Sequence, residues 1–137
     1  MDKKQLKIED FHFKHKINTR WKDLDAFGHI NNAVFLTYIE DARIQFFKRW
    51  RINYKERSLI VASAKINYLR QVTHPSDLVI AQKVSRIGTK SFDIYSVVFI
   101  ENESSPVCES TIISVAFDFI KNKSVNVYQA IIDDYNL

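Results

Sequence analysis

The sequence has little glycine, proline or cysteine: two, two and one among 137 residues. The single cysteine, Cys108, excludes an intrachain disulfide, and its neighbours Val107 and Glu109 form no redox motif. No apolar run approaches the roughly 18 to 20 residues that span a bilayer. The start of the chain, Met-Asp-Lys-Lys-Gln-Leu-Lys, lacks the apolar core of a signal peptide. These absences predict a cytoplasmic protein without a disulfide or a membrane-spanning segment.

The rest of the composition is typical of one folded domain. Hydrophobic residues make up 46% of the chain and charged residues 26%, near the average of globular proteins, which argues against disorder. The length fits a single domain over residues 1–137 with a real core. The net charge is +4, but the basic residues are scattered from Lys3 to Lys123. We therefore expect no nucleic-acid partner, although a positive field would attract a substrate that carries phosphates.

The first part of the chain predicts one strand and one long helix. From Asp10 to Thr19, apolar and polar side chains alternate as in a half-buried strand. Asn31 or Asn32 is expected to cap the helix that follows, from Ala33 to about Arg51. Apolar residues at spacings of three and four give this helix one core-facing stripe: Phe35, Ile39, Ala42, Phe46 and Trp50.

After the helix, the pattern changes to long runs rich in Val, Ile, Phe, Tyr and Ser, separated by short polar breaks. These runs predict four antiparallel strands: Ser58–Val72, Asp77–Ile87, Ser91–Glu103 and Val107–Phe119. A strand, one long helix and a four-stranded meander predict an α+β fold in which the sheet covers the helix.

The segment between the first strand and the helix concentrates the chemistry. Asp23, Asp25 and one of the two glycines, Gly28, lie here with a histidine and two asparagines. The glycine indicates a backbone that needs positive φ or close approach to a ligand. The two aspartates precede a helix N-terminus, whose free N–H groups form an anion or oxyanion site. This combination suits acyl transfer, because the donor polarises a carbonyl while a carboxylate attacks it or deprotonates a water.

Other chemistries have less support in the residues. The four histidines are spread over several predicted elements and the cysteine adds no ligand, so no metal site is predicted. The sequence has no Gly-x-Ser-x-Gly elbow, no phosphate-binding glycine loop and no dinucleotide fingerprint. Local chemistry alone leaves open whether Asp25 is a catalytic group or a turn residue. It equally leaves open whether His29 is only a hydrogen-bonded loop residue.

The residues from Trp21 to Arg43 resemble the signature of hotdog-fold thioesterases of the 4-hydroxybenzoyl-CoA thioesterase type, in the acyl-CoA thioesterase branch. The likeness lies in an Asp-x-Asp-x-x-Gly-His-x-Asn-Asn core followed by Glu-x-Ala-Arg on the helix. A second stretch, Gly88-Thr-Lys-Ser91, resembles the strand junction that faces the thioester in this family. The resemblance implies a hotdog fold, a long central helix wrapped by a five-stranded antiparallel sheet, and hydrolysis of a thioester.

The resemblance also implies roles for single residues. Asp25 matches the catalytic carboxylate, which acts as nucleophile or general base, and the backbone N–H of Asn32 matches the donor that polarises the thioester carbonyl. His29 aligns with the catalytic histidine of the related acyl-ACP thioesterases. That branch has an asparagine where this chain has Phe27, which weakens the acyl-ACP interpretation and leaves the role of His29 open.

The remaining residues of the two landmarks are expected to support the loop or contact the substrate. Asp23 and Asn31 are predicted to brace the loop through hydrogen bonds, and Gly28 to let the backbone approach the substrate. In the second landmark, the residues predicted to contact the pantetheine arm or the thioester are Thr89, Lys90 and Ser91. The alternative is that they form a plain surface turn. Three aromatic residues are candidates for the acyl pocket, with core packing as the alternative: Phe27, Phe35 and Tyr38.

An acyl-CoA is the implied substrate, with no metal and no separate cofactor. The resemblance implies a homodimer, or a homotetramer formed as a dimer of dimers, in which Asp25 of one subunit meets the Thr89–Ser91 turn of the other. Two alternatives stay open, an acyl-ACP thioesterase and a non-catalytic hotdog module that binds acyl thioesters or a partner protein. The length and type of the acyl group are also open.

Overall fold

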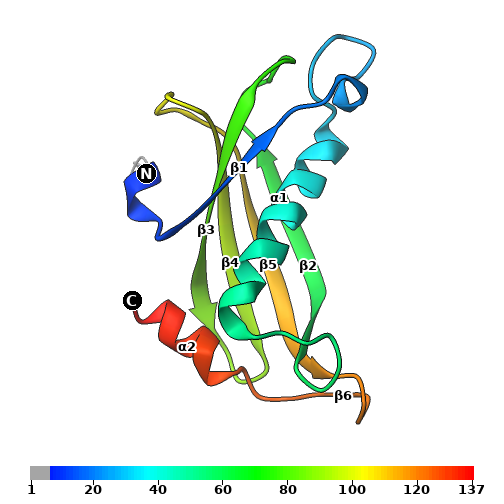
Figure 1. Cartoon of the computed structure of the whole chain (residues 1–137), viewed down its shortest axis with the longest axis vertical. Coiled ribbons are helices and arrows are strands. Elements are labelled where there is room, and N and C mark those ends of the chain that lie inside the picture. Colours follow the sequence, from blue (N-terminus) through cyan, green and yellow to red (C-terminus); the bar gives the residue numbers. More distant parts are fainter. Residues whose placement is uncertain (1–6) are drawn as a thin grey trace.

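The computed structural model describes residues 7–137 as one antiparallel sheet with a long helix across it (Figure 1). The main strands are β1 (Phe13–Asn18), β2 (Ser58–Tyr68), β3 (Asp77–Ile87), β4 (Ser91–Ile100) and β5 (Pro106–Asp118). The helices are α1 (Asn32–Phe47) and α2 (Gln129–Tyr135), with short 3-10 turns η1 (Ile8–Asp10), η2 (Trp21–Asp23) and η3 (Lys48–Trp50). The predicted α+β fold with five main strands is confirmed.

The strands lie in the order β1-β3-β4-β5-β2, and each neighbouring pair is antiparallel. A two-residue strand, β6 (Lys123–Ser124), pairs with the end of β5 and was not predicted. The predicted strand from Ser58 to Val72 was too long, since β2 ends at Tyr68. The chain turns away there because the N–H groups of the next two residues both donate to the carbonyl of Val107, at 2.9 and 3.1 Å.

The buried stripe of α1 joins this helix to the sheet. Its five predicted members are all buried, so the predicted core-facing stripe is confirmed. The last of them, Trp50, lies in η3, where the helix tightens into its final turn. Burying such side chains contributes about 1.5 to 3 kcal/mol each before the entropy of ordering is subtracted. A hydrogen bond also joins the helix to the sheet in this layer: the Gln82 side chain donates to the main-chain carbonyl of Ile39 at 3.1 Å.

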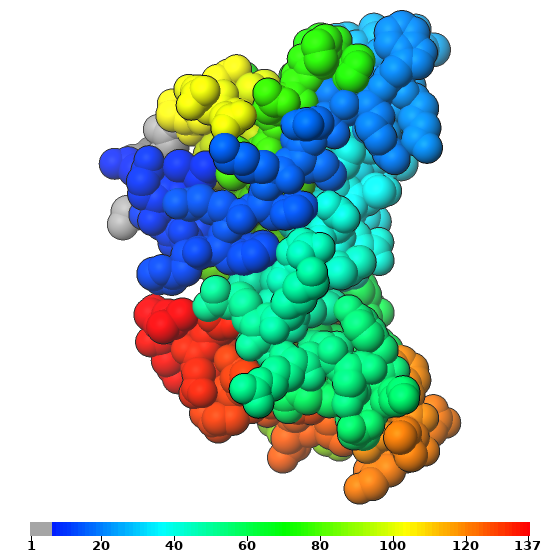
Figure 2. Space-filling view, in the orientation of Figure 1, coloured from blue at the N-terminus to red at the C-terminus, as the bar shows by residue number. Residues whose placement is uncertain are grey.

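The C-terminal part of the chain contains a second helix that the apolar pattern did not reveal. The helix α2 has only seven residues, and Ile131 is its one buried side chain. Ile131 belongs to the same apolar cluster as Trp50 and Phe92. The N-terminal segment, α1 and α2 form most of the surface seen in the space-filling view (Figure 2). None of the helices within residues 7–137 is long and apolar enough to cross a membrane.

The strand β2 lies at one end of the sheet and has an unusually open surface. Among the described residues it pairs with β5 alone, so its other edge carries unpaired main-chain groups. Most of its side chains are exposed, including the apolar Ile60 and Val61. A long, apolar and exposed edge strand is a template for pairing with another chain. The other end of the sheet differs, since β1 alternates regularly between half-buried and exposed residues.

Candidate active site

The loop between η2 and α1 is closed by main-chain hydrogen bonds. Asp25 N–H donates to the carbonyl of His29 at 2.8 Å, and Gly28 N–H donates back to the carbonyl of Asp25 at 3.3 Å. Ile30 N–H bonds to the carbonyl of Val72 at 2.7 Å, which ties the loop to the segment after β2. The short polar turn predicted from the sequence is therefore a fixed loop at one end of the sheet.

Gly28 lies in this loop at φ +80°, a conformation that side chains on L-residues rarely adopt. A Cβ atom built on Gly28 would meet no atom within 4 Å. Positive φ therefore explains the glycine without any close contact inside the described chain. The second expected role of Gly28, to let the backbone approach the substrate, stays a prediction.

The two carboxylate oxygens of Asp25 have different surroundings. Its Oδ1 accepts hydrogen bonds from the N–H groups of Phe27 at 2.8 Å and His29 at 3.2 Å. Its Oδ2 accepts no hydrogen bond from any residue of the described chain. Asp25 is thus a turn residue through one oxygen, and the other oxygen stays available for a substrate or a water.

The first turn of α1 leaves one main-chain donor open. Asn31 is the N-cap, because its Oδ1 accepts from Ala33 N–H at 2.9 Å and its carbonyl accepts from Val34 N–H at 2.9 Å. Asn31 N–H itself donates to the carbonyl of Asp23 at 2.9 Å. The N–H of Asn32 finds no acceptor within residues 7–137. It lies at the positive end of the helix dipole, so it is suited to bind a developing negative charge.

Asp25 and Asn32 line the same cavity, which has a volume of about 490 Å³. The end of β2 and the residues after it also line this cavity, including Tyr68 and Leu69. His29 also lines the cavity, and its imidazole has no hydrogen-bond partner in the described part of the chain. Three residues that carry an open carboxylate oxygen, an imidazole and an open N–H thus line one cavity: Asp25, His29 and Asn32.

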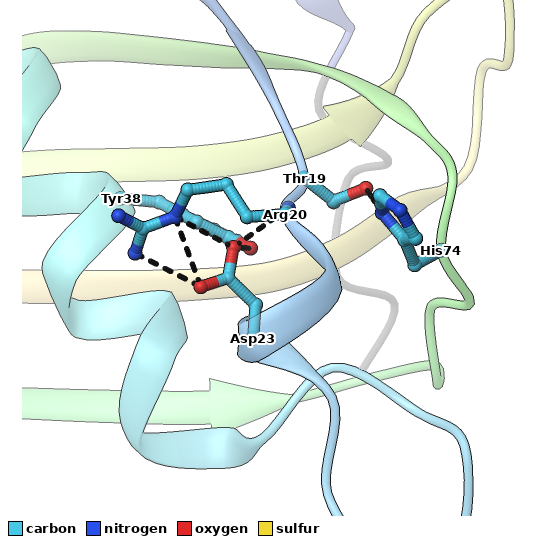
Figure 3. A network of polar contacts seen from close by, with 5 residues as sticks. All are labelled: Thr19, Arg20, Asp23, Tyr38 and His74. Atoms are coloured by element: carbon cyan, nitrogen blue, oxygen red, sulfur yellow. Dashed lines mark hydrogen bonds and ion pairs between the residues drawn. The ribbon is translucent and has the colours of Figure 1, made fainter.

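Asp23, at the end of η2 just before the loop, is a fully engaged, buried carboxylate (Figure 3). Arg20 donates to its Oδ1 through Nη2 at 2.9 Å and Nε at 3.1 Å, and Arg20 N–H donates to its Oδ2 at 2.9 Å. Tyr38 donates to the same Oδ2 from α1. Burial alone would raise the pKa of Asp23, but the hydrogen bonds from Arg20 and Tyr38 outweigh it and hold the pKa below its usual value. These contacts give Asp23 a bracing role.

The second landmark lies at the other end of the molecule. The turn from Gly88 to Ser91 joins β3 and β4 at the bottom of Figure 1, whereas the Asp25 loop is at the top. Its carbonyls at Thr89 and Lys90 accept from Val127 N–H at 3.0 Å and Ala116 N–H at 2.9 Å. Within one chain, the structure therefore does not bring Thr89–Ser91 to the cavity of Asp25.

Gly88 is required for a different reason than Gly28. A Cβ atom on Gly88 would lie 2.7 Å from Nη1 of Arg86 and 3.0 Å from the carbonyl oxygen of Ser91. Its N–H donates to that same carbonyl at 2.7 Å. A side chain here would require Arg86 and Ser91 to move, so the tight turn favours glycine even though its φ is not in the left-handed region.

The three aromatic candidates for the acyl pocket differ in their surroundings. Phe35 lines the cavity, whereas the hydroxyl of Tyr38 is engaged with Asp23 and Phe27 is 84% exposed. Sequence reasoning missed Tyr68, since its place at the end of an ordinary strand pattern carries no local signal. No group of three His, Cys, Asp or Glu side chains within residues 7–137 is placed to hold a metal ion.

Comparison with known proteins identifies related sequences and structures. Residues 19–133 match the family model of the thioesterase-like superfamily. The uncharacterized protein YsmA of Bacillus subtilis is 36% identical over 87 residues, which cover 62% of this chain and 59% of YsmA, so the match spans less than two thirds of that relative. The long-chain acyl-CoA thioesterase FadM of Escherichia coli is 26% identical over 115 residues, covering 80% of this chain and 86% of FadM.

Solved structures share the fold over nearly the whole chain. A putative thioesterase, PA2801 of Pseudomonas aeruginosa, superimposes with a TM-score of 0.83 at 25% identity, covering 90% of this chain and 97% of that one. A thioesterase of Thermus thermophilus, solved with coenzyme A and Zn, gives a TM-score of 0.82 at 25% identity, covering 93% of this chain and 99% of that one.

Proposed function

Since this chain belongs to the thioesterase-like superfamily and has the hotdog fold, we propose that it is an acyl-CoA thioesterase, which hydrolyses an acyl-CoA to the free acid and CoA. One observation carries the proposal. One cavity is lined both by Asp25, whose Oδ2 is open, and by Asn32, whose N–H is open, and a carboxylate and an oxyanion donor are the two groups that thioester hydrolysis needs. We also propose that it belongs to the 4-hydroxybenzoyl-CoA thioesterase type.

The two groups divide the reaction between them. The Asn32 N–H donates to the thioester carbonyl oxygen and stabilises the negative charge that forms there. Asp25 either attacks the carbonyl carbon through Oδ2, giving an anhydride that water then hydrolyses, or takes a proton from an attacking water. In both routes the C–S bond breaks, the CoA sulfur receives a proton and water supplies the hydroxyl of the acid. His29 lines the same cavity and is a further candidate for contact with the substrate.

CoA has more support than a carrier protein as the group that carries the acyl chain of the substrate. FadM, a relative at 26% identity, is named a long-chain acyl-CoA thioesterase, and a structural neighbour at 25% identity was solved with coenzyme A. Phe27 also replaces the asparagine of the acyl-ACP branch, and its exposed side chain does not line the cavity. The acyl-ACP thioesterase is the second enzyme to test, and a non-catalytic binding module is the third possibility.

The open edge of β2 favours an assembly of two copies. If β2 pairs antiparallel with β2 of a second copy, the two subunits lie side by side in opposite orientations along this strand. The Thr89–Ser91 turn and the Asp25 loop lie at opposite ends of one subunit. In the paired arrangement, the turn of the partner therefore lies near the Asp25 loop of this subunit. We propose that the turn completes the site in this way, in a homodimer or in a homotetramer made of two such dimers.

Hydrolysis of a panel of acyl-CoA thioesters tests the activity. We expect Asp25→Asn to lower kcat at least about a hundredfold, in the range of losses seen when one catalytic group is removed. Asp133→Asn is the matched control, since Asp133 is a surface carboxylate on α2 whose one hydrogen bond within residues 7–137 is local, to Gln129. Full activity of Asp25→Asn would contradict the mechanism.

The same panel separates the alternatives. Faster turnover of one acyl group on a carrier protein than on CoA would favour the acyl-ACP enzyme. Tight binding of a non-hydrolysable acyl-CoA analogue without any hydrolysis would favour the binding module.

Mixed assemblies test the completed site. If Asp25 and the turn meet across the interface, dimers of Asp25→Asn with Ser91→Trp chains contain one site with both changes and one site with neither. Random mixing should then restore roughly one quarter of the parent activity from two inactive proteins, because half of the dimers are mixed. No recovery would contradict a site that is completed across the interface.

A further inference from the structure

Tyr68 lies where the edge strand of the sheet meets the N-terminus of α1. It is the last residue of β2, and its partner on the neighbouring strand is Cys108. The side chain is partly exposed and lines the cavity that also holds Asp25. Burial, followed by the proximity of Cys108, raises the pKa of Tyr68, so its hydroxyl stays protonated and able to donate.

The hydroxyl of Tyr68 makes one specific contact. It donates to the carbonyl oxygen of Asn32 at 2.8 Å. The ring lies 5.9 Å from the ring of Phe35, one turn further along α1. The tyrosine therefore holds the first residue of the helix from outside the helix, while its ring forms part of the cavity wall.

This contact completes the fixation of Asn32. The peptide group before Asn32 is held because its carbonyl, from Asn31, accepts Val34 N–H. The peptide group after it is held at both ends, by Asn31 Oδ1 on the Ala33 N–H and by the Tyr68 hydroxyl on the Asn32 carbonyl. Both backbone dihedrals of Asn32 are thereby restricted, and the direction of its open N–H is restricted with them.

We propose that Tyr68 is a positioning residue for thioester hydrolysis, which holds the Asn32 N–H in the direction that the oxyanion requires. The proposal rests on the proposed function, since it assigns Tyr68 to the oxyanion donor of that reaction. Oxyanion donors act through preorganisation, and a displacement of about 1 Å costs up to about a hundredfold in rate. A contact that only stabilised the fold would not affect the chemical step in this way.

Removal of the hydroxyl alone tests the role. Tyr68→Phe keeps the ring beside Phe35 and deletes only the donor to Asn32. Tyr95→Phe is the matched control, because its hydroxyl also donates one hydrogen bond, to Glu109 Oε2 at 2.6 Å, away from the cavity. Both variants and Asp25→Asn are compared with the parent on the acyl-CoA that the parent hydrolyses fastest.

We expect Tyr68→Phe to lower kcat about tenfold while KM changes less than about twofold, the pattern of an interaction that matters in the transition state. Tyr95→Phe should keep the parent kcat. An independent readout is the ¹⁵N order parameter of the Asn32 amide, which should fall in Tyr68→Phe and stay unchanged in Tyr95→Phe.

The outcomes separate the two proposals. Parent-like kcat in Tyr68→Phe, or an equal fall in both tyrosine variants, would overturn the positioning role while leaving the thioesterase intact. A parent that hydrolyses no thioester, or an Asp25→Asn variant as active as the parent, would overturn the proposed function. An unchanged order parameter at Asn32 together with a lower kcat would also overturn the positioning role, because the hydroxyl would then act on the substrate directly.

Discussion

Tyr38 donates a hydrogen bond from its hydroxyl to Oδ2 of Asp23 at 2.5 Å, which joins the buried face of α1 to the turn before the active-site loop. The length is typical of a hydroxyl that donates to an ionised carboxylate. The carbonyl of Asp23 in turn accepts the N–H of Asn31, the residue that caps α1. The position of the loop therefore depends on a buried carboxylate whose two oxygens both accept hydrogen bonds from Arg20 or Tyr38.

Asp23→Asn should destabilise the fold by about 1 to 3 kcal/mol, because the amide cannot accept all the hydrogen bonds that reach both oxygens. Either the guanidinium of Arg20 at Oδ1 or the hydroxyl of Tyr38 at Oδ2 would lose its acceptor, depending on which oxygen the amide nitrogen replaces. The free energy of unfolding measured in urea gives the value, with Asp133→Asn as the surface control. A change below about 0.5 kcal/mol, the usual size for a surface substitution, would contradict the bracing role.

The pH dependence of the same pair has a definite sign. The pKa of Asp23 is lower in the folded protein than its ordinary value of 3.8. A carboxyl group of this kind contributes stability above its unfolded pKa and loses that stability as the pH falls through the folded pKa. The difference in Tm between the parent and Asp23→Asn should therefore be largest near neutral pH and shrink below pH 3.8. A difference that grows as the pH falls would show that the sign is wrong.

The two glycines should respond differently to substitution. Gly28→Ala places a side chain at φ +80°, which costs about 1 to 2 kcal/mol, while Gly28→Asn should recover part of this because asparagine tolerates that conformation. At Gly88, asparagine should be no better than alanine, since the obstacle is contact with Ser91 and Arg86. Thermal unfolding of the four variants decides the matter, and rescue by asparagine at both sites would contradict it.

These contrasts show which parts of the fold and site the sequence predicted. The stripe of α1 and the α+β fold follow from local periodicity, and capping chemistry narrowed the helix cap to Asn31 or Asn32, of which the structure shows Asn31. The contact of Tyr68 with Asn32 joins residues 36 positions apart, and only the folded sheet brings them together. The helix α2 was missed because seven residues with one buried side chain give too short a pattern.

Association of two copies through β2 should be sensitive to charge on its open edge. Val61 is 47% exposed on β2, and Val61→Lys should weaken strand pairing, as lysine does on natural edge strands. Ile120→Lys is the control, because Ile120 is 71% exposed but lies beyond the end of β5. Sedimentation equilibrium should show a multiple of 16.1 kDa for the parent and the control, and 16.1 kDa for Val61→Lys. A monomeric parent would contradict the proposed assembly.

Cys108 should be inert towards thiol reagents in the folded protein, although it neighbours Tyr68 in the sheet. Burial, with a smaller contribution from Glu109, raises the pKa of the thiol to about 12, and only the thiolate reacts. At about pH 8, iodoacetamide should therefore leave folded Cys108 unlabelled and thioester hydrolysis unchanged, while the urea-unfolded chain is labelled. Mass spectrometry measures the labelling. Rapid alkylation of the folded chain with loss of activity would mean that the thiol reaches the cavity, and the assignment of the reaction to Asp25 would have to be revised.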